Sequence, residues 1–282
     1  MIQLIHGDCL DVLPRLPGEL DVVMTSPPYN LGIGYRTYKD GGTRLDYLNF
    51  SRHWLDAVKK KLARSGSLFL NMGGKPTDPW PPYEVLGVAR DAGYVLQNTL
   101  YWIKSMSEAD TPVWGHVKPV NSERFVNDAV EFVFHLTHEG DVELAKRSPG
   151  VGVGFADESN LSRGERGKHG NIRCRGNAVC IPYKTIQSRD KDRPHPATFP
   201  PALAEYCYRL HGVEKIKMTC DPFAGLGSSA VAARKLGLPH TGIEIDEYYH
   251  AEACKSLGIV PGTVAAPPAT SAVVGTSPLE EF

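Results

Sequence analysis

Two consecutive prolines interrupt the chain where a short, mostly apolar segment ends. Residues 20–25 read LDVVMT, and Ser26, Pro27, Pro28 and Tyr29 follow at once. Proline has no backbone N–H to donate and disfavours helical geometry in the residue before it, so a strand must end here and no helix can begin. We therefore predict a buried strand that ends in a rigid turn carrying Ser26 and Tyr29. In α/β proteins, ligands bind at the carboxyl ends of strands.

The rest of the chain alternates between strand-like and helix-like segments. Continuous apolar runs are typical of strands buried on both faces, and apolar residues at helical spacing indicate the helices that pack on them. This alternation predicts an α/β domain with a mostly parallel, doubly wound sheet. Segments 95–104 and 129–138 are rich in aromatic and β-branched residues and predict an antiparallel pair at one sheet edge. The other predicted strands are 2–8, 20–26, 67–72, 215–223 and 240–246, and the predicted helices are 9–16, 45–62 (ended by Gly66), 81–93, 197–210 and 225–237.

Three stretches lack both patterns. Residues 31–43 contain four glycines and predict a surface loop or lid. Residues 140–194 are dominated by Gly, Pro, Arg and Asn, which predicts an inserted region with little regular structure. Residues 260–282 are rich in Pro, Ala, Thr and Ser and predict a disordered tail.

Composition is that of a soluble globular protein, with 41% hydrophobic and 22% charged residues. No apolar run approaches the roughly 18 residues of a membrane span, and the N-terminus lacks a signal-peptide pattern, so we expect a cytoplasmic protein without a membrane partner. The six cysteines include no Cys-x-x-Cys, and the spacing of Cys174 and Cys180 does not match common zinc sites. We therefore expect free thiols and no metal.

Basic residues gather in one segment although the net charge is −1. Between residues 161 and 193 there are nine Lys or Arg against three Asp or Glu. Such a segment suits an anionic partner, and a solvated loop face is the alternative explanation.

A glycine-rich turn between a predicted strand and a predicted helix is the second chemical motif. It spans residues 223–228 (FAGLGS), and Glu244 ends the next strand. Glycines let the backbone turn sharply beside a ligand, and a carboxylate placed there accepts hydrogen bonds from ribose hydroxyls. Ala230 replaces the third glycine of a pyrophosphate site, and Asp221 would repel a pyrophosphate and attract an ammonium. A nucleoside that carries an amino acid, such as S-adenosylmethionine, therefore fits better than NAD; a tight turn followed by a surface Glu is the alternative.

The turn at Ser26–Tyr29 has groups suited to the exocyclic amine of a nucleobase. The lone pair of this amine is delocalised into the ring, and acceptors aimed at its N–H groups pull it toward tetrahedral geometry. Ser26 Oγ and the Pro27 carbonyl are the candidate acceptors, because the locked φ of proline holds that carbonyl in place. The Tyr29 ring offers a surface for an extruded base. A purely structural Pro-Pro turn is the alternative.

Together these motifs resemble the amino-methyltransferases of DNA, in the circularly permuted class called beta. In that class the Pro-Pro-Tyr motif precedes the cofactor loop, and the target-recognition region lies between them; here TSPPYN (25–30) precedes DPFAGLGSS (221–229). The resemblance covers residues 4–257 and implies a Rossmann-like methyltransferase fold, S-adenosylmethionine as cofactor and double-stranded DNA as partner. It divides the chain into a catalytic half (1–139), an inserted target-recognition region (140–194), a cofactor-binding half (195–259) and a tail (260–282).

The resemblance also implies roles for single residues. Asp8 in GDC would contact the adenine amine, HPATFP (195–200) would line the methionine end, and Glu244 would bind the ribose. Phe223 would lie near adenine and Asp221 near the amino-acid moiety. Leu226 and Ser229 are mild departures from the family pattern. The implied catalytic set is Ser26, Pro27, Pro28 and Tyr29; the implied cofactor set is Asp8, Cys9, Thr198, Asp221, Phe223, Ala224, Gly225, Gly227, Ser228, Glu244 and Ile245; the implied DNA-binding set is Arg36, Lys39, Arg173, Arg175, Lys184 and Arg189.

The residue before Pro-Pro-Tyr indicates the base. Serine at this position resembles the motif of the cytosine-N4 enzymes, whereas Asp or Asn resembles that of the adenine-N6 enzymes. Ser26 therefore favours the N4 amine of cytosine as the target. The expected mechanism is base flipping followed by direct in-line transfer. Adenine-N6 methylation is the nearest alternative. Methylation at cytosine C5 needs a cysteine nucleophile after a proline, and the sequence has no Pro-Cys. Motif order argues against an RNA or protein-glutamine methyltransferase, and the intact motifs argue against an inactive DNA-binding module.

The resemblance further suggests where the protein acts. It implies a prokaryotic, nucleoid-associated location in the cytoplasm. A cognate restriction endonuclease and a homodimer are possible partners, and the sequence reveals neither of them nor the recognised DNA site.

Overall fold

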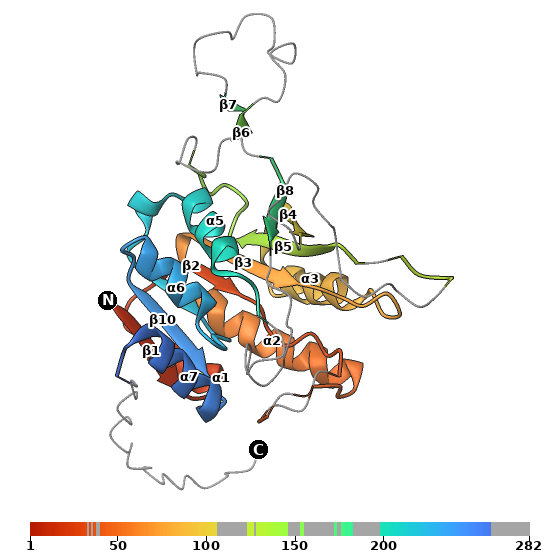
Figure 1. Ribbon diagram of the computed structural model, residues 1–282, viewed down its shortest axis with the longest axis horizontal. Helices are drawn as coiled ribbons and strands as arrows, with labels where there is room; N and C mark the ends of the chain where they lie inside the picture. Colours follow the sequence, from red (N-terminus) through yellow and green to blue (C-terminus); the bar gives the residue numbers. More distant parts are fainter. Residues whose placement is uncertain are drawn as a thin grey trace, which may run out of the picture.

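Eight strands form one sheet, in the order β1-β10-β9-β2-β3-β5-β4-β8, within the part of the chain that the computed structural model describes (Figure 1). Its neighbouring strands pair in parallel, except β3 with β5 and β5 with β4. The predicted α/β fold with a mostly parallel sheet is therefore confirmed. The described residues are 1–32, 34, 36–37, 40–105, 123–126, 128–145, 153–154, 172–173, 176–182 and 198–260.

The elements follow the predicted alternation closely. The strands are β1 (Ile2–His6), β2 (Leu20–Thr25), β3 (Leu62–Met72), β4 (Val95–Ser105), β5 (Val130–Thr137), β6 (Val153–Gly154), β7 (Ile172–Arg173), β8 (Ala178–Pro182), β9 (Thr219–Asp221) and β10 (His240–Glu244). The α-helices are α1 (Cys9–Val12), α2 (Arg44–Lys61), α3 (Pro81–Asp91), α5 (Pro201–His211), α6 (Ser228–Lys235) and α7 (Glu247–Leu257), and short 3₁₀ turns are η1 (Leu13–Arg15) and η3 (Val213–Lys215).

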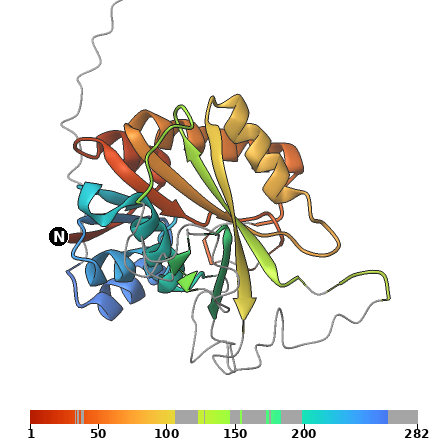
Figure 2. The same ribbon diagram turned by 90° about the horizontal axis from the view of Figure 1, so that it is seen from above.

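Helices cover both faces of the sheet (Figure 2). Helices α1, α2 and α3 pack on one face, where Trp54 of α2 is fully buried. Helices α5 and α6 pack on the other, where Tyr208 of α5 is fully buried. Strand β2 supplies Val23 to the first core and Val22 and Met24 to the second. A strand buried on both faces needs a continuous apolar run, which explains the sequence before the two prolines.

Helix α2 ends at Lys61, and the prediction that Gly66 ends it is wrong. Gly66 lies inside β3, at a register shift where Leu20 pairs with Leu62 and Val22 pairs with Ser67. A Cβ atom on Gly66 would lie 2.8 Å from the Ala63 carbonyl oxygen. The glycine therefore allows a tight bend within a strand, which is a common use of glycine in sheets.

Strands β4 and β5 form the predicted antiparallel pair, but they do not form the sheet edge. Strand β8 pairs in parallel with β4, Val179 and Ile181 face the core, and Trp102 Nε1 donates a hydrogen bond to the Ile181 carbonyl at 2.9 Å. Because β8 lies within residues 140–194, part of the region predicted to be irregular belongs to the main sheet. The division of the chain into halves and an insertion stays a prediction.

Helix α7 was not predicted from the sequence. It begins after Asp246, whose carboxylate accepts hydrogen bonds from the backbone N–H groups of Tyr248 and Tyr249, and it ends at Gly258, whose φ is 60°. Its apolar side packs on Leu4 of β1 and on α6. No helix in the described ranges is long and apolar enough to cross a membrane. Residues 261–282 of the predicted tail lie outside the described residues.

A buried chain of polar side chains connects β4, β5, β3 and α5. Asn98 Nδ2 donates to His135 Nδ1 at 3.0 Å, so His135 Nε2 carries the proton and donates to Ser67 Oγ at 2.8 Å. Ser67 then donates to His211 Nδ1 at 2.9 Å. Burial lowers the pKa of His135 to about 3, and burial also lowers the pKa of His211 to about 4. Both imidazoles are therefore neutral in the folded protein.

Acidification is expected to destabilise the protein well above the pH at which most carboxylates titrate. Burial lowers the pKa of His240 to about 3, so three histidines take up protons on unfolding. The pKa of Asp221, raised to about 6 by burial, acts in the opposite direction, but it is one group against three. From these shifts we expect the free energy of unfolding to fall by about 3 kcal/mol between about pH 7.5 and about pH 5.5. Urea unfolding at both pH values measures this, and equal stability at both would contradict it.

Candidate active site

Asp221, at the carboxyl end of β9, joins three segments. Its side chain is 1% exposed, and it accepts hydrogen bonds from Thr25 Oγ1 at 2.7 Å, Ser229 Oγ at 2.7 Å and Phe223 N at 3.0 Å. Both carboxylate oxygens are thus used internally, and burial raises the pKa of Asp221 to about 6. The enclosed carboxylate holds the turn and the glycine-rich loop together, and its predicted contact with the amino-acid moiety of the cofactor stays a prediction. Since Thr25 precedes Ser26, this contact brings the two sequence motifs together.

Glu244, at the end of β10, lies beside the glycine-rich loop. Gly225 N donates to Glu244 Oε2 at 2.7 Å, and Asp246 N donates to Oε1 at 2.9 Å. Burial raises the pKa of Glu244. Gly225 and Gly227 have φ values of 52° and 82°, in the left-handed region that favours glycine. A carboxylate accepts about four hydrogen bonds, so Glu244 keeps acceptor capacity for hydroxyl groups.

Apolar and half-buried side chains surround this loop. Phe223 contacts Trp54 and Phe50 edge-on, with ring centroids 5.5 and 6.0 Å apart, and the side chain of Ile245 is 44% exposed. Asp8 is half-buried and accepts a hydrogen bond from Leu10 N at 2.8 Å. Three further predicted cofactor residues are Thr198 and Ser228, both half-buried, and Ala224, which is buried.

Cys9, a predicted cofactor residue, has a buried side chain. It is 4% exposed and belongs to the core between the sheet and α1. Burial, with a contribution from neighbouring Asp8, raises the pKa of Cys9 to about 12. The thiol therefore packs as a small apolar group, and a contact of Cys9 with the cofactor stays a prediction.

The Ser26–Tyr29 turn is fixed by hydrogen bonds to β3. The hydroxyl groups of Ser26 and Tyr29 lie 2.6 Å apart, and Asn71 Nδ2 donates to Tyr29 Oη at 2.8 Å. The Tyr29 hydroxyl is also placed to donate to the backbone carbonyl of Asn71 at 3.1 Å. Ser26 is half-buried and Pro27 is buried, so these hydrogen bonds fix a turn that is partly covered.

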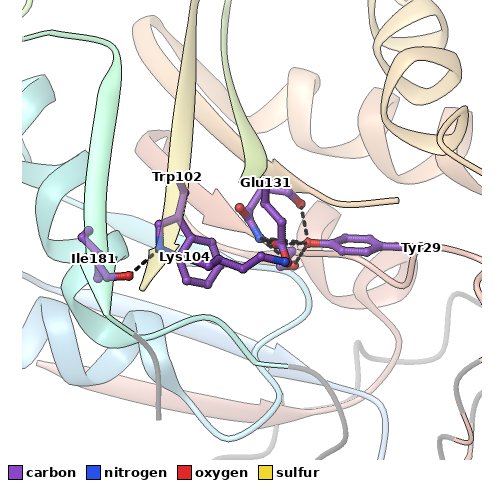
Figure 3. A network of polar contacts seen from close by, with 7 residues as sticks. Tyr29, Trp102, Lys104, Glu131 and Ile181 are labelled. Atoms are coloured by element: carbon purple, nitrogen blue, oxygen red, sulfur yellow. Dashed lines mark hydrogen bonds and ion pairs between the residues drawn. The ribbon is translucent and has the colours of Figure 1, made fainter. Parts of the chain in front are cut away.

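An ion pair extends this network away from the turn (Figure 3). Asn71 Nδ2 donates to Glu131 Oε2 at 2.9 Å, and Lys104 Nζ donates to Glu131 Oε1 at 3.2 Å. The side chains of Lys104 and Glu131 are only 9% and 19% exposed. The Tyr29 hydroxyl lies 3.4 Å from Glu131 Oε2.

The sequence analysis missed Asn71, Glu131 and Lys104. Each is a polar residue beside apolar ones within a strand, in the segments LFLNM, AVEFVF and LYWIK. A buried polar or charged group needs a partner, so these three residues were a signal that the strands meet at a polar site. Asn71 and Lys104 both bond Glu131, and no single segment of the sequence shows that these three residues meet.

The predicted DNA-binding residues are only partly described. The Arg36 guanidinium lies over the Tyr248 ring, 4.6 Å from its centroid, at the start of α7. Nearby, Thr37 Oγ1 donates to Asp246 Oδ2. Arg173 belongs to the two-residue strand β7, whose side chains are not described. Lys39, Arg175, Lys184 and Arg189 lie outside the described residues.

Comparison with known proteins places this geometry in a family. The family model described as DNA methylase, which groups N6 and N4 enzymes, matches residues 20–255. This chain belongs to the DNA methylase family. The matched range contains both the Ser26–Tyr29 turn and the glycine-rich loop, so the predicted family is confirmed.

Relatives of this methylase agree with that assignment. It is 26% identical over 275 residues to the type II methyltransferase M.ScaI of Streptomyces caespitosus, covering 88% of this chain and 78% of that protein. Its fold is similar to that of the PvuII DNA methyltransferase, described as cytosine-N4-specific, with a TM-score of 0.64 and 20% identity over 90% of this chain and 85% of that one. It is also similar to a DNA modification methylase of Thermus thermophilus solved with S-adenosyl-L-methionine, described as putative, with a TM-score of 0.58 and 19% identity over 92% of this chain and 93% of that one.

Proposed function

We propose that this DNA methylase transfers a methyl group from S-adenosylmethionine to the exocyclic N4 amine of cytosine in double-stranded DNA. The observation that carries the proposal is the Ser26 hydroxyl, held 2.6 Å from Tyr29 at the end of β2 and next to Thr25, which bonds the cofactor loop through Asp221. A hydroxyl at this place is an acceptor for an amine N–H. The cytosine-N4-specific PvuII enzyme among the similar folds supports this choice of base.

The residues around the glycine-rich loop fit S-adenosylmethionine. Glu244 has acceptor capacity for the ribose hydroxyls, and Phe223 and Ile245 offer apolar surface to an adenine ring. The left-handed glycines Gly225 and Gly227 allow the backbone to approach a ligand without a Cβ atom. The Thermus relative solved with this cofactor supports the assignment. When bound, S-adenosylmethionine supplies a methyl group on a positively charged sulfur.

The turn residues prepare the base. Ser26 Oγ and the Pro27 carbonyl accept hydrogen bonds from the two N–H bonds of the amine, which moves its lone pair out of conjugation. The Tyr29 ring, fixed through its hydroxyl by Asn71, stacks on a base that has been flipped out of the duplex. With the cofactor bound, the amine nitrogen held in this way would form its bond to the methyl carbon as the sulfur–methyl bond breaks, leaving a neutral thioether, and one N–H proton would pass to water.

DNA is the proposed partner, with the basic segment 161–193 as the main contact region. Arginine and lysine side chains there would bind phosphates and read bases. The type II naming of the relatives supports a role beside a restriction endonuclease, in the cytoplasm of a prokaryote. A homodimer is a further expectation that the proposed chemistry does not require.

Product analysis tests the proposal. The purified protein is incubated with S-adenosylmethionine and unmethylated genomic DNA, the DNA is digested to nucleosides, and methylated nucleosides are identified by mass spectrometry against standards. We expect N4-methylcytosine. N6-methyladenine would keep the family and overturn the choice of base, and that outcome is the second candidate because the matching family model includes both chemistries. No methylated nucleoside would contradict DNA methylation altogether.

A further inference from the structure

A chain of hydrogen bonds runs from Ser26 through Tyr29 and Asn71 to Glu131, which pairs with Lys104. Figure 3 shows Tyr29, Glu131 and Lys104 of this chain. A charged pair that is mostly buried is costly to desolvate, and replacing such a pair with apolar residues is often neutral or stabilising. Lys104 and Glu131 are therefore poorly explained as a contribution to stability alone. Their position behind the proposed catalytic hydroxyl indicates a role in the site.

The direction of hydrogen bonding follows from counting donors. An ionised carboxylate only accepts, so Asn71 must turn its Nδ2 toward Glu131 Oε2 and its second Nδ2 hydrogen toward Tyr29 Oη. This orientation leaves Asn71 Oδ1 buried without a partner among the described residues. Leaving the amide oxygen without a partner costs free energy, and strong hydrogen bonds from the amide nitrogen can offset that cost. The Glu131 carboxylate is such a strong acceptor.

Two arrangements remain for the hydroxyls of Ser26 and Tyr29. In the first, Tyr29 donates to Ser26, and the Ser26 hydrogen points outward, toward an incoming N–H. In the second, Ser26 donates to Tyr29, and Tyr29 donates inward to the Asn71 carbonyl at 3.1 Å or to Glu131 Oε2 at 3.4 Å. Asn71 Nδ2 also lies 3.4 Å from Ser26 Oγ, a longer contact than its 2.8 Å bond to Tyr29 Oη. Only the second arrangement turns the Ser26 hydrogen away from the base, so that Ser26 Oγ faces the base as an acceptor.

We propose that Glu131, paired with Lys104, is a positioning residue that sets this direction: it turns the Ser26 hydroxyl hydrogen inward, so that Ser26 accepts from the amine of the target base and discriminates it from a carbonyl. The inference rests on the proposed function. Glu131 touches neither base nor cofactor in this scheme, and it acts through Asn71, Tyr29 and Ser26.

Replacement of Glu131 separates hydrogen-bond direction from size. Glu131→Gln keeps the size but brings an amide that also donates, whereas Glu131→Asp shortens the side chain but keeps an acceptor-only group. We expect Glu131→Gln to lower kcat by roughly tenfold to a hundredfold, by analogy with the loss of groups that orient the ligands of metal sites. Glu131→Asp should retain more turnover than Glu131→Gln. The opposite order would overturn the proposal.

A binding measurement tests the direction without turnover. The probe is a DNA duplex in which the target base, identified by product analysis, lies opposite an abasic site. The target position carries either the native base or its carbonyl analogue, which is uracil for cytosine or hypoxanthine for adenine. Wild-type protein should prefer the amine, and Glu131→Gln should shift the affinity ratio toward the carbonyl by about fivefold, the size of one net hydrogen bond. An unchanged ratio in a variant with wild-type melting temperature would overturn the inference.

A double variant and a matched control complete the test. In a Ser26→Ala background, Glu131→Gln should cost less than twofold more in kcat, because its effect runs through Ser26; independent, multiplying losses would overturn the proposal. Glu205→Gln removes an ion-paired carboxylate of α5, 2.9 Å from Arg209, and should leave kcat and the affinity ratio unchanged. Wild-type protein that methylates no DNA would defeat the proposed function itself, whereas active wild type with an insensitive Glu131→Gln would defeat only this inference.

Discussion

Ser26→Ala is expected to lower kcat by about a hundredfold while the Kd for S-adenosylmethionine stays within about twofold of wild type. The reason is that the hydroxyl is an acceptor for the amine during transfer, and loss of one preorganised hydrogen-bonding group at a reacting centre typically costs about 10²–10³ in kcat. Glu244 and Phe223, the residues proposed to bind the cofactor, lie on other elements and are not altered by this substitution. Single-turnover kinetics on DNA that contains the identified methylation site measures the rate of transfer. Calorimetric titration with S-adenosylmethionine measures the Kd.

The control for this variant is Ser256→Ala. Ser256 donates a hydrogen bond within α7, to the Ala253 carbonyl at 2.9 Å, and it is remote from the Ser26 network. It should leave kcat unchanged. If kcat and cofactor affinity fell together in Ser26→Ala, the acceptor role would be wrong, and Ser26 would instead be supporting the cofactor loop.

Asp221→Ala should produce the largest loss of stability among single substitutions at the site. It removes the acceptor for Thr25, Ser229 and Phe223 N, all of which then lack a partner in a buried place. Each buried polar group left unsatisfied costs about 1–3 kcal/mol, so we expect the free energy of unfolding to fall by about 3 kcal/mol or more. Cofactor affinity should fall as well, because the loop is no longer fixed to β2.

Asp221→Asn gives a graded comparison. Its remaining oxygen can still accept from Phe223 N and Thr25, and the Ser229 hydroxyl can rotate to accept from the new amide, so the loss should be about 1 kcal/mol. Asp56→Ala is the control, because Asp56 pairs with Arg52 on the exposed side of α2, and it should change stability by less than about 0.5 kcal/mol. Urea unfolding ranks the three variants. A loss in Asp221→Ala no larger than in Asp56→Ala would show that the cluster is not stabilising.

The motifs that the sequence analysis found are those whose chemistry lies within one short segment. Ser26 to Tyr29 form one turn, and residues 223–228 form another, so residue order alone indicates them. The pattern of α2 was equally local, since Trp54, Leu55 and Val58 lie on one helical face and are buried. Local propensity and periodicity are enough in such cases because the interacting groups are a few residues apart.

The errors came from features that depend on distant partners. Gly66 looked like a helix end but serves a bend that is defined by pairing with β2. Strand β8 has only five residues, with alternating exposed and buried side chains. Such a short pattern does not predict a strand by itself, and β8 forms because it pairs with β4. The sequence also did not show that Thr25 and Ser229 enclose Asp221.

The sequence by itself determined the α/β fold, the two motifs and the family, because continuous apolar runs, helical spacing and the Pro-Pro and glycine turns are local properties of the chain. Only the tertiary structure decided which polar groups meet. Lys104, Asn71 and Glu131 come from three strands, and Thr25 and Asp221 are 196 residues apart. Their contacts exist because the sheet order places β9 beside β2 and β3 beside β5, and burial there obliges each polar group to find the other.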